Sequence, residues 1–103
     1  MGNEQRVKGD PHDAIETYKY IVEHFQEEDT WELAGVYYYL GMCYQRVGNA
    51  PQAMQSWAAG VSINRYYRDN YFGLGVIFLD SKLYDMAIGV LLEALHTTKR
   101  AYG

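Results

Sequence analysis

The sequence of 103 residues has one cysteine, two prolines and no long apolar run. The lone Cys43 excludes a disulfide within the chain and is typical of a protein from a reducing compartment. The longest apolar segments, 33–44 and 71–79, are too short and too rich in Tyr and Gly to span a bilayer. No apolar segment follows a basic start at the N-terminus. We therefore expect a soluble, cytoplasmic protein that does not contact a membrane.

The sequence also lacks the patterns that support catalysis, metal binding or nucleic-acid binding. The net charge is −4, and no concentrated basic stripe is present, which argues against a nucleic-acid partner. There is no Gly-rich phosphate loop and no nucleophile elbow. His12, His24 and His96 are scattered and have no ligand spacing to one another or to Cys43. We therefore predict no enzymatic activity, no cofactor and no metal site.

The most informative feature that is present is an internal repeat. The pattern Tyr-x2-Leu-Gly-x2-Tyr at 37–44, followed by Ala53, returns as Tyr-x2-Leu-Gly-x2-Phe at 71–78, followed by Ala87. The spacing from Tyr37 to Tyr71 is the repeat period, and every other residue of the pattern moves by the same spacing without an insertion. A fixed period of about 34 residues indicates that one small structural unit packs against copies of itself.

Each copy has the pattern of two helices joined by a short loop. Tyr37, Leu40, Gly41 and Tyr44 have the i, i+3, i+4, i+7 spacing of one helical face. A glycine in the middle of a helix costs about 1 kcal/mol relative to Ala, so Gly41 predicts close approach of a neighbouring helix. Gly48 predicts the end of that helix and Asn49 the N-cap of the next. In the following copy we expect helices at about 69–79 and 84–95.

These residues resemble the tetratricopeptide repeat, whose pattern is Trp-x2-Leu-Gly-x2-Tyr, then Ala-x3-Phe, over about 34 residues. A partial unit with Gly9, Ala14 and Tyr18 precedes the two full copies, and five residues are inserted at about 27–31. The resemblance implies an all-α fold, a right-handed stack of antiparallel helical hairpins. It implies one domain over 1–103, with a partial repeat at about 1–33 and repeats at about 34–67 and 68–101. Because the first helix of the partial unit would begin before residue 1, we expect a fragment of a longer protein or a partner that covers the ends.

Members of this family bind partners on the face lined by the first helix of each unit, so the resemblance implies a binding groove there. Its middle is aromatic and aliphatic and its rim is charged, which favours an apolar or helical segment of a partner protein. The predicted groove residues are Tyr38, Met42, Gln45, Arg46, Asp69, Phe72, Val76 and Leu79.

A structural alternative fits the same sequence. An aromatic stripe at helical spacing is also typical of a buried core, and exposed Tyr and Phe side chains are good anchors for self-association. The chain is then a self-associating unit such as a homodimer, or a helical appendage of a larger protein, for example a glycosyltransferase. In either case the chain's own or swapped helices cover the groove. The sequence does not separate these alternatives from peptide binding.

Overall fold

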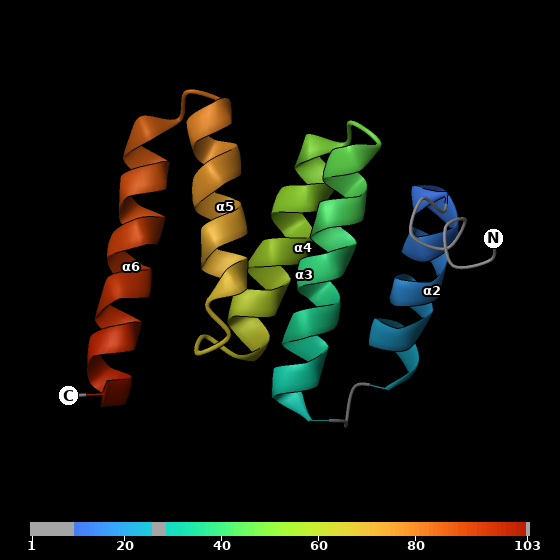
Figure 1. The fold of residues 1–103 in the computed structure, drawn as a ribbon, viewed down its shortest axis with the longest axis horizontal. Coiled ribbons are helices and arrows are strands. Elements are labelled where there is room, and N and C mark those ends of the chain that lie inside the picture. Colours follow the sequence, from blue (N-terminus) through green and yellow to red (C-terminus); the bar gives the residue numbers. More distant parts are fainter. Residues whose placement is uncertain (1–9, 26–28, 103) are drawn as a thin grey trace, which may run out of the picture.

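The computed structural model describes residues 10–25 and 29–102, and within these ranges the chain forms five α-helices (Figure 1). The helices are α2 (Pro11–His24), α3 (Thr30–Arg46), α4 (Ala50–Ile63), α5 (Asp69–Asp80) and α6 (Tyr84–Tyr102). The predicted all-α fold is therefore confirmed for the described residues. The predicted remnant of a first helix, with Gly9, lies outside them, and so do residues 27 and 28 of the predicted insertion.

Helices α2 and α4 begin at side chains that accept a backbone hydrogen bond. Asp10 Oδ1 accepts the N–H of His12 at 2.9 Å, and Asn49 Oδ1 accepts the N–H of Gln52 at 3.2 Å. A prolyl residue in the first turn of α2 and of α4 removes an N–H that has no partner within the helix. The N-cap predicted at Asn49 is thus confirmed.

The repeat period is visible in the backbone as well as in the sequence. After α3, the N–H groups of residues 47, 48 and 49 donate to the carbonyls of residues 43, 45 and 44. After α5, those of residues 81, 82 and 83 donate to the carbonyls of residues 77, 79 and 78, each one period later. Gly48 and Lys82 both have positive φ, 82° and 62°. The two helical pairs therefore share the geometry of their connecting turns.

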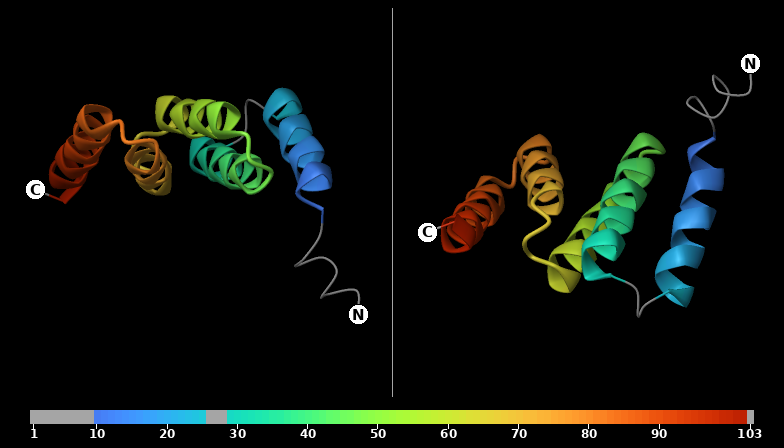
Figure 2. Two further views of the ribbon diagram at one scale, coloured as in Figure 1. Left: turned by 90° about the horizontal axis from the view of Figure 1, so that it is seen from above. Right: turned by 60° about the horizontal axis from the view of Figure 1, so that its bottom comes forward.

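Neighbouring helices in the chain are also neighbours in space (Figures 1 and 2). α2 packs on α3, α3 on α4, and α5 on α6. The two pairs meet because α5 contacts both α4 and α3. α6 and α2 consequently lie at opposite ends of the row in Figure 1.

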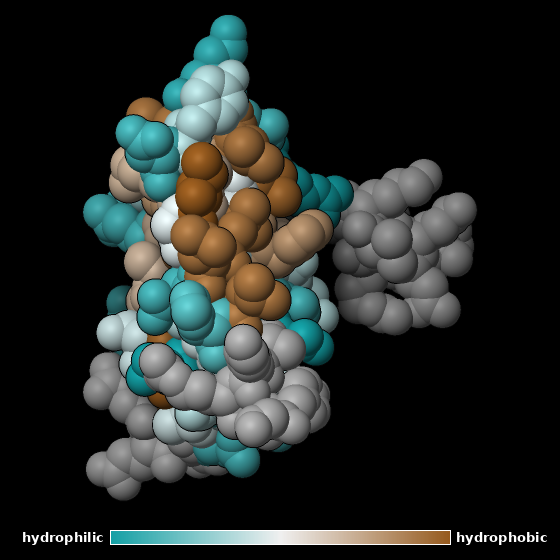
Figure 3. Space-filling view, turned by 90° about the vertical axis from the view of Figure 1, so that its left-hand side faces the viewer, coloured by the Kyte–Doolittle hydropathy of each residue, from teal (hydrophilic) through white to brown (hydrophobic). Residues whose placement is uncertain are grey.

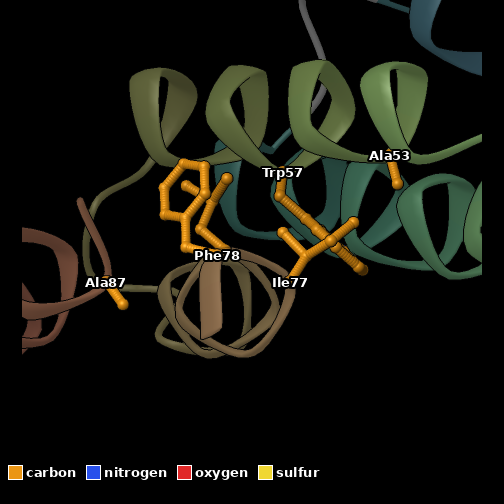
Figure 4. Close-up of a cluster of buried hydrophobic side chains, with 6 residues drawn as sticks. Ala53, Trp57, Ile77, Phe78 and Ala87 are labelled. Carbon is orange, nitrogen blue, oxygen red and sulfur yellow. The ribbon is translucent and has the colours of Figure 1, made fainter. Parts of the chain in front are cut away.

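The main core lies where α4 meets α5 (Figure 4). Its buried residues are Ala53, Trp57, Leu74, Ile77, Phe78 and Ala87. The mid-helix glycines of the repeat each receive a large side chain from the second helix of their pair. A Cβ atom on Gly41 would lie 2.5 Å from Trp57 Nε1, and one on Gly75 would lie 2.9 Å from Leu91 Cδ2. The close approach predicted at Gly41 is confirmed.

Two helix boundaries differ from the prediction. α6 continues to Tyr102 and does not end near residue 95, because no Gly or Pro interrupts residues 90–102. α3 begins at Thr30, so Thr30 and Trp31 of the predicted insertion are helical. Asp29 accepts the N–H of Trp31 at 2.7 Å and caps this added turn.

Candidate functional site

The candidate site is an apolar groove of about 450 Å³ between α5 and α6. We call it the α5/α6 groove, and it is lined by Arg68, Asp69, Phe72, Leu91, Ala94 and Leu95. Phe72 and Leu95 are 64% and 62% exposed. Large apolar side chains that remain this exposed on a folded surface are typical of interaction sites.

The preceding helical pair has an equivalent set of residues. The residues one period before the lining residues form a set that we call the α3/α4 site: Ala34, Gly35, Tyr38, Trp57, Gly60 and Val61. In contrast to their counterparts, four of these six residues are buried, and Tyr38 and Val61 are half-buried. The α3/α4 site is covered by the segment that leads into α5 and by α5 itself.

Asn70 of α5 packs into the α3/α4 site. Its side chain is fully buried, and its Nδ2 donates a hydrogen bond to the Ala34 carbonyl oxygen at 3.0 Å. The amide group occupies the space that a Cβ atom on Gly60 would require. The absence of a side chain at residue 60 is thus what allows Asn70 to reach the backbone of α3.

Trp57 lies between the two helical pairs (Figure 4). Its indole packs against Gly41 of α3 on one side and Gly73 of α5 on the other, where a Cβ atom would lie 2.6 Å from Cε2. Trp57 Nε1 donates to the Tyr38 carbonyl oxygen at 3.0 Å. Both ring contacts need a glycine, because a Cβ atom at residue 41 or 73 would overlap with the indole. The two glycines therefore let α3 and α5 approach Trp57 of α4 closely.

Tyr67, just before α5, completes the cover of the α3/α4 site. Its hydroxyl oxygen lies 3.1 Å from the position of a Cβ atom on Gly35, and its ring is 6.4 Å from that of Tyr38. Burial, and secondarily the negative charge of Asp69, raises the pKa of both Tyr38 and Tyr67. The chain therefore contains an occupied example of the groove that α5 and α6 form one period later.

The structure divides the predicted groove residues among three places. Asp69 and Phe72 line the α5/α6 groove, and Val76 and Leu79 continue the exposed apolar side of α5 at 38% and 46% exposure. Tyr38 is half-buried and packs against the core.

The other predicted residues lie near the end of α3. Met42 and Arg46 line a second cavity, of about 580 Å³, between α2 and α3, and Gln45 is exposed on the same turn. Cys43 lines this cavity too. Burial raises the pKa of its thiol, an effect that Arg46 partly offsets. The cavity thus offers the thiol no strong activation.

Sequence reasoning missed the contribution of α6 to the groove. Leu91, Ala94 and Leu95 are not among the predicted groove residues. The available signal was the period itself, because Trp57, Gly60 and Val61 precede them by one period. The period alone does not show that these residues form a contact surface. It does so only together with the observation that Tyr67, Asn70 and Gly73 cover the equivalent residues of the α3/α4 site.

The outer side of α6 carries a second exposed apolar surface. Figure 3 faces this end of the molecule and shows apolar side chains gathered into one band. Four large side chains recur along it at intervals of four, four and three residues: Tyr84, Ile88, Leu92 and Leu95. They are 51% to 62% exposed. We call these four residues the α6 stripe. Leu95 belongs to both the stripe and the groove.

The described residues include no group of three or more His, Cys, Asp or Glu side chains placed to hold a metal ion. No helix within the described ranges has both the length and the apolar character that crossing a membrane requires. Comparisons with protein-family models, with curated proteins and with solved structures give no match for this chain.

Proposed function

We propose that this chain is a tetratricopeptide-like, non-catalytic interaction module that binds a helical segment of a partner protein in the α5/α6 groove. The helical pairs then stack as a right-handed solenoid, with repeats at about 34–67 and 68–101. The exposed apolar side of α5, with Phe72, Val76 and Leu79, extends this binding surface beyond the groove.

One observation carries this proposal. Each of the six residues of the α5/α6 groove has a counterpart one period earlier, and five of these counterparts contact α5 or its leading segment: Ala34, Gly35, Tyr38, Trp57 and Gly60. Helical docking of this kind uses the apolar face of an amphipathic helix as the anchor. A groove built to the same plan, with Phe72 and Leu95 exposed, is suited to a ligand of the same class.

A second candidate function, self-association, is favoured by the α6 stripe. A continuous apolar band of Tyr, Ile and Leu side chains on one helix is the kind of surface that two copies bury against each other (Figure 3). In this case α6 of one copy packs on α6 of the other, and the groove is only part of the interface.

Two matched variants test the proposal. Leu95→Glu places a charge in the groove and Leu92→Glu places one on the stripe outside it, and both residues are more than half exposed, at 62% and 51%. Helical peptides selected for binding to the unmodified chain should lose affinity for the Leu95→Glu variant and keep it for the Leu92→Glu variant. Peptides that bind all three proteins equally would exclude the groove as the binding site.

The same variants address self-association when their solution mass is measured by light scattering. If the α6 stripe joins two copies, the unmodified chain is a dimer and either substitution dissociates it. If the groove binds a partner instead, the unmodified chain stays a monomer over a wide concentration range.

A further inference from the structure

We infer that the helix that binds the α5/α6 groove carries a small residue opposite Ala94 and a large aliphatic residue three positions later, opposite Leu91. This inference rests on the proposed function and specifies the partner's chemistry. It comes from comparing the groove with the occupied α3/α4 site, residue by residue.

Ala94 determines the first position. Its counterpart is Gly60, which accepts the side chain of Asn70 only because it has no Cβ atom. Ala94 has a methyl group at that place, so an Asn in the bound helix would overlap with it. A residue of the size of Gly, Ala or Ser leaves the space that this methyl group needs.

Leu91 determines the second position, three residues further along the bound helix. Its counterpart Trp57 fills the space between α3 and α5. A Cβ atom at residue 73 of α5 would overlap with the indole, and residue 73 is a glycine. Leucine is shorter than tryptophan and leaves part of that space unfilled. A Leu, Ile or Met in the bound helix fills it, and filling apolar space of this kind stabilises a packed interface.

Asp69 and its neighbour Arg68 add charges of opposite sign at the edge of the groove, and Asp69 determines a third position. Its counterpart is Gly35, on which the ring of Tyr67 lies. Tyr67 lies just before α5, three residues ahead of Asn70, so a partner residue just before the bound helix would lie near the Asp69 carboxylate. A Lys or Arg at that place complements the negative charge.

This pattern argues for a different protein as the ligand and against a second copy of this chain docking through α5. The α5 sequence carries Asn70 and Gly73, the two residue types that fit the α3/α4 site and not the α5/α6 groove. In its own chain the Asn70 side chain is already fully buried. The favoured ligand is therefore an amphipathic helix with a small and a large aliphatic residue three positions apart, and with a basic residue three positions before the small one, just ahead of the helix.

Two synthetic peptides based on residues 66–80 test the inference. Both carry Tyr67→Lys, for solubility and to match Asp69. One keeps Asn70 and Gly73, and the other carries Asn70→Ala and Gly73→Leu. Their affinities are measured for the unmodified chain and for the Ala94→Gly variant, which gives the α5/α6 groove the glycine that the α3/α4 site has at residue 60. A second variant, Leu91→Trp, gives the groove the counterpart of Trp57. It supplies an independent measurement if one variant fails to fold.

The change in peptide preference between proteins is the decisive quantity. The Ala/Leu peptide is intrinsically more helical than the Asn/Gly peptide, and this advantage cancels when the ratio of affinities is compared between proteins. We expect Ala94→Gly and Leu91→Trp each to shift this ratio toward the Asn/Gly peptide by about fivefold or more.

Each outcome has a distinct meaning. Binding of the peptides with an unchanged ratio in both variants would overturn the inferred residue pattern but leave the proposed function in place. Binding that survives Leu95→Glu would place the peptides elsewhere and overturn both. A dimeric chain that binds neither peptide until Leu92→Glu dissociates it would show that a second copy occupies this end of the molecule, and would overturn the inference of a foreign helix.

Discussion

The side chain of Asn70 packs directly against Gly60, where the two helical pairs meet. The Asn70 amide fills the volume of the missing Gly60 side chain, and its Nδ2 donates to the Ala34 carbonyl oxygen at 3.0 Å. Glycine at residue 60 and asparagine at residue 70 are therefore a matched pair. Four other helical glycines have a side chain within 3.1 Å of the Cβ position, and these are Gly35, Gly41, Gly73 and Gly75.

The substitution Gly60→Ala should destabilise the protein. The added methyl group displaces the Asn70 amide, and overpacking of a core costs about 1–3 kcal/mol. Loss of the hydrogen bond to Ala34 adds to that cost. Urea unfolding followed by circular dichroism gives the free energy of unfolding. If stability were unchanged, Asn70 would not pack on Gly60 as described.

The substitution Gly89→Ala should have the opposite effect. Gly89 lies within α6, and no atom is found within 4 Å of its Cβ position among the described residues. Alanine is the better helix former by about 0.5–1 kcal/mol, so the free energy of unfolding should rise by that amount. A loss of stability would reveal a packing partner for Gly89 that the described residues do not include.

Tyr38 and Phe72 occupy equivalent positions in the two pairs but should respond differently to truncation. Phe72 is 64% exposed, so Phe72→Ala should change the free energy of unfolding by no more than about 0.5 kcal/mol. Tyr38 is half-buried against the core, so Tyr38→Ala should cost roughly 1–3 kcal/mol. Equal effects in the same unfolding assay would contradict the assignment of one residue to a covered site and the other to an open groove.

Stability should fall at alkaline pH. Burial raises the pKa values of Tyr18, Tyr38 and Tyr67 above 10.0, so the folded state keeps protons that the unfolded state releases. Their contribution is fully present below the unfolded pKa and is lost as the pH rises from there through the folded value. The free energy of unfolding, measured between pH 8 and about 11, should decrease less steeply in a Tyr67→Phe variant. Identical slopes would show that Tyr67 does not contribute.

The helices could be predicted from the sequence where glycine, proline and capping residues mark their ends. Gly48 and Asn49 locate the turn between α3 and α4. No glycine or proline lies near residue 95, where the end of α6 was predicted, and the helix continues to Tyr102. Lys82 has the positive φ expected of a glycine, and only the turn shared with Gly48 explains it.

The candidate site could be predicted only in part. Asp69 and Phe72 could be placed on one face of α5 because the residues that share a helical face are determined by the spacing within that helix. The contribution of α6 depends on which side chains meet across two helices, and spacing within one helix does not contain that information. The repeat period supplies it only together with the observed contacts of Gly60 and Trp57.

The most direct test of the account is a nuclear magnetic resonance titration of the isotope-labelled chain with the Ala/Leu peptide. If the α5/α6 groove binds a helix, the largest shift changes will fall on Phe72, Leu91, Ala94 and Leu95. Residues of α2 will keep their resonance positions. Changes centred on Met42 and Cys43, in the cavity between α2 and α3, would contradict the account, and so would the absence of any change at saturating peptide.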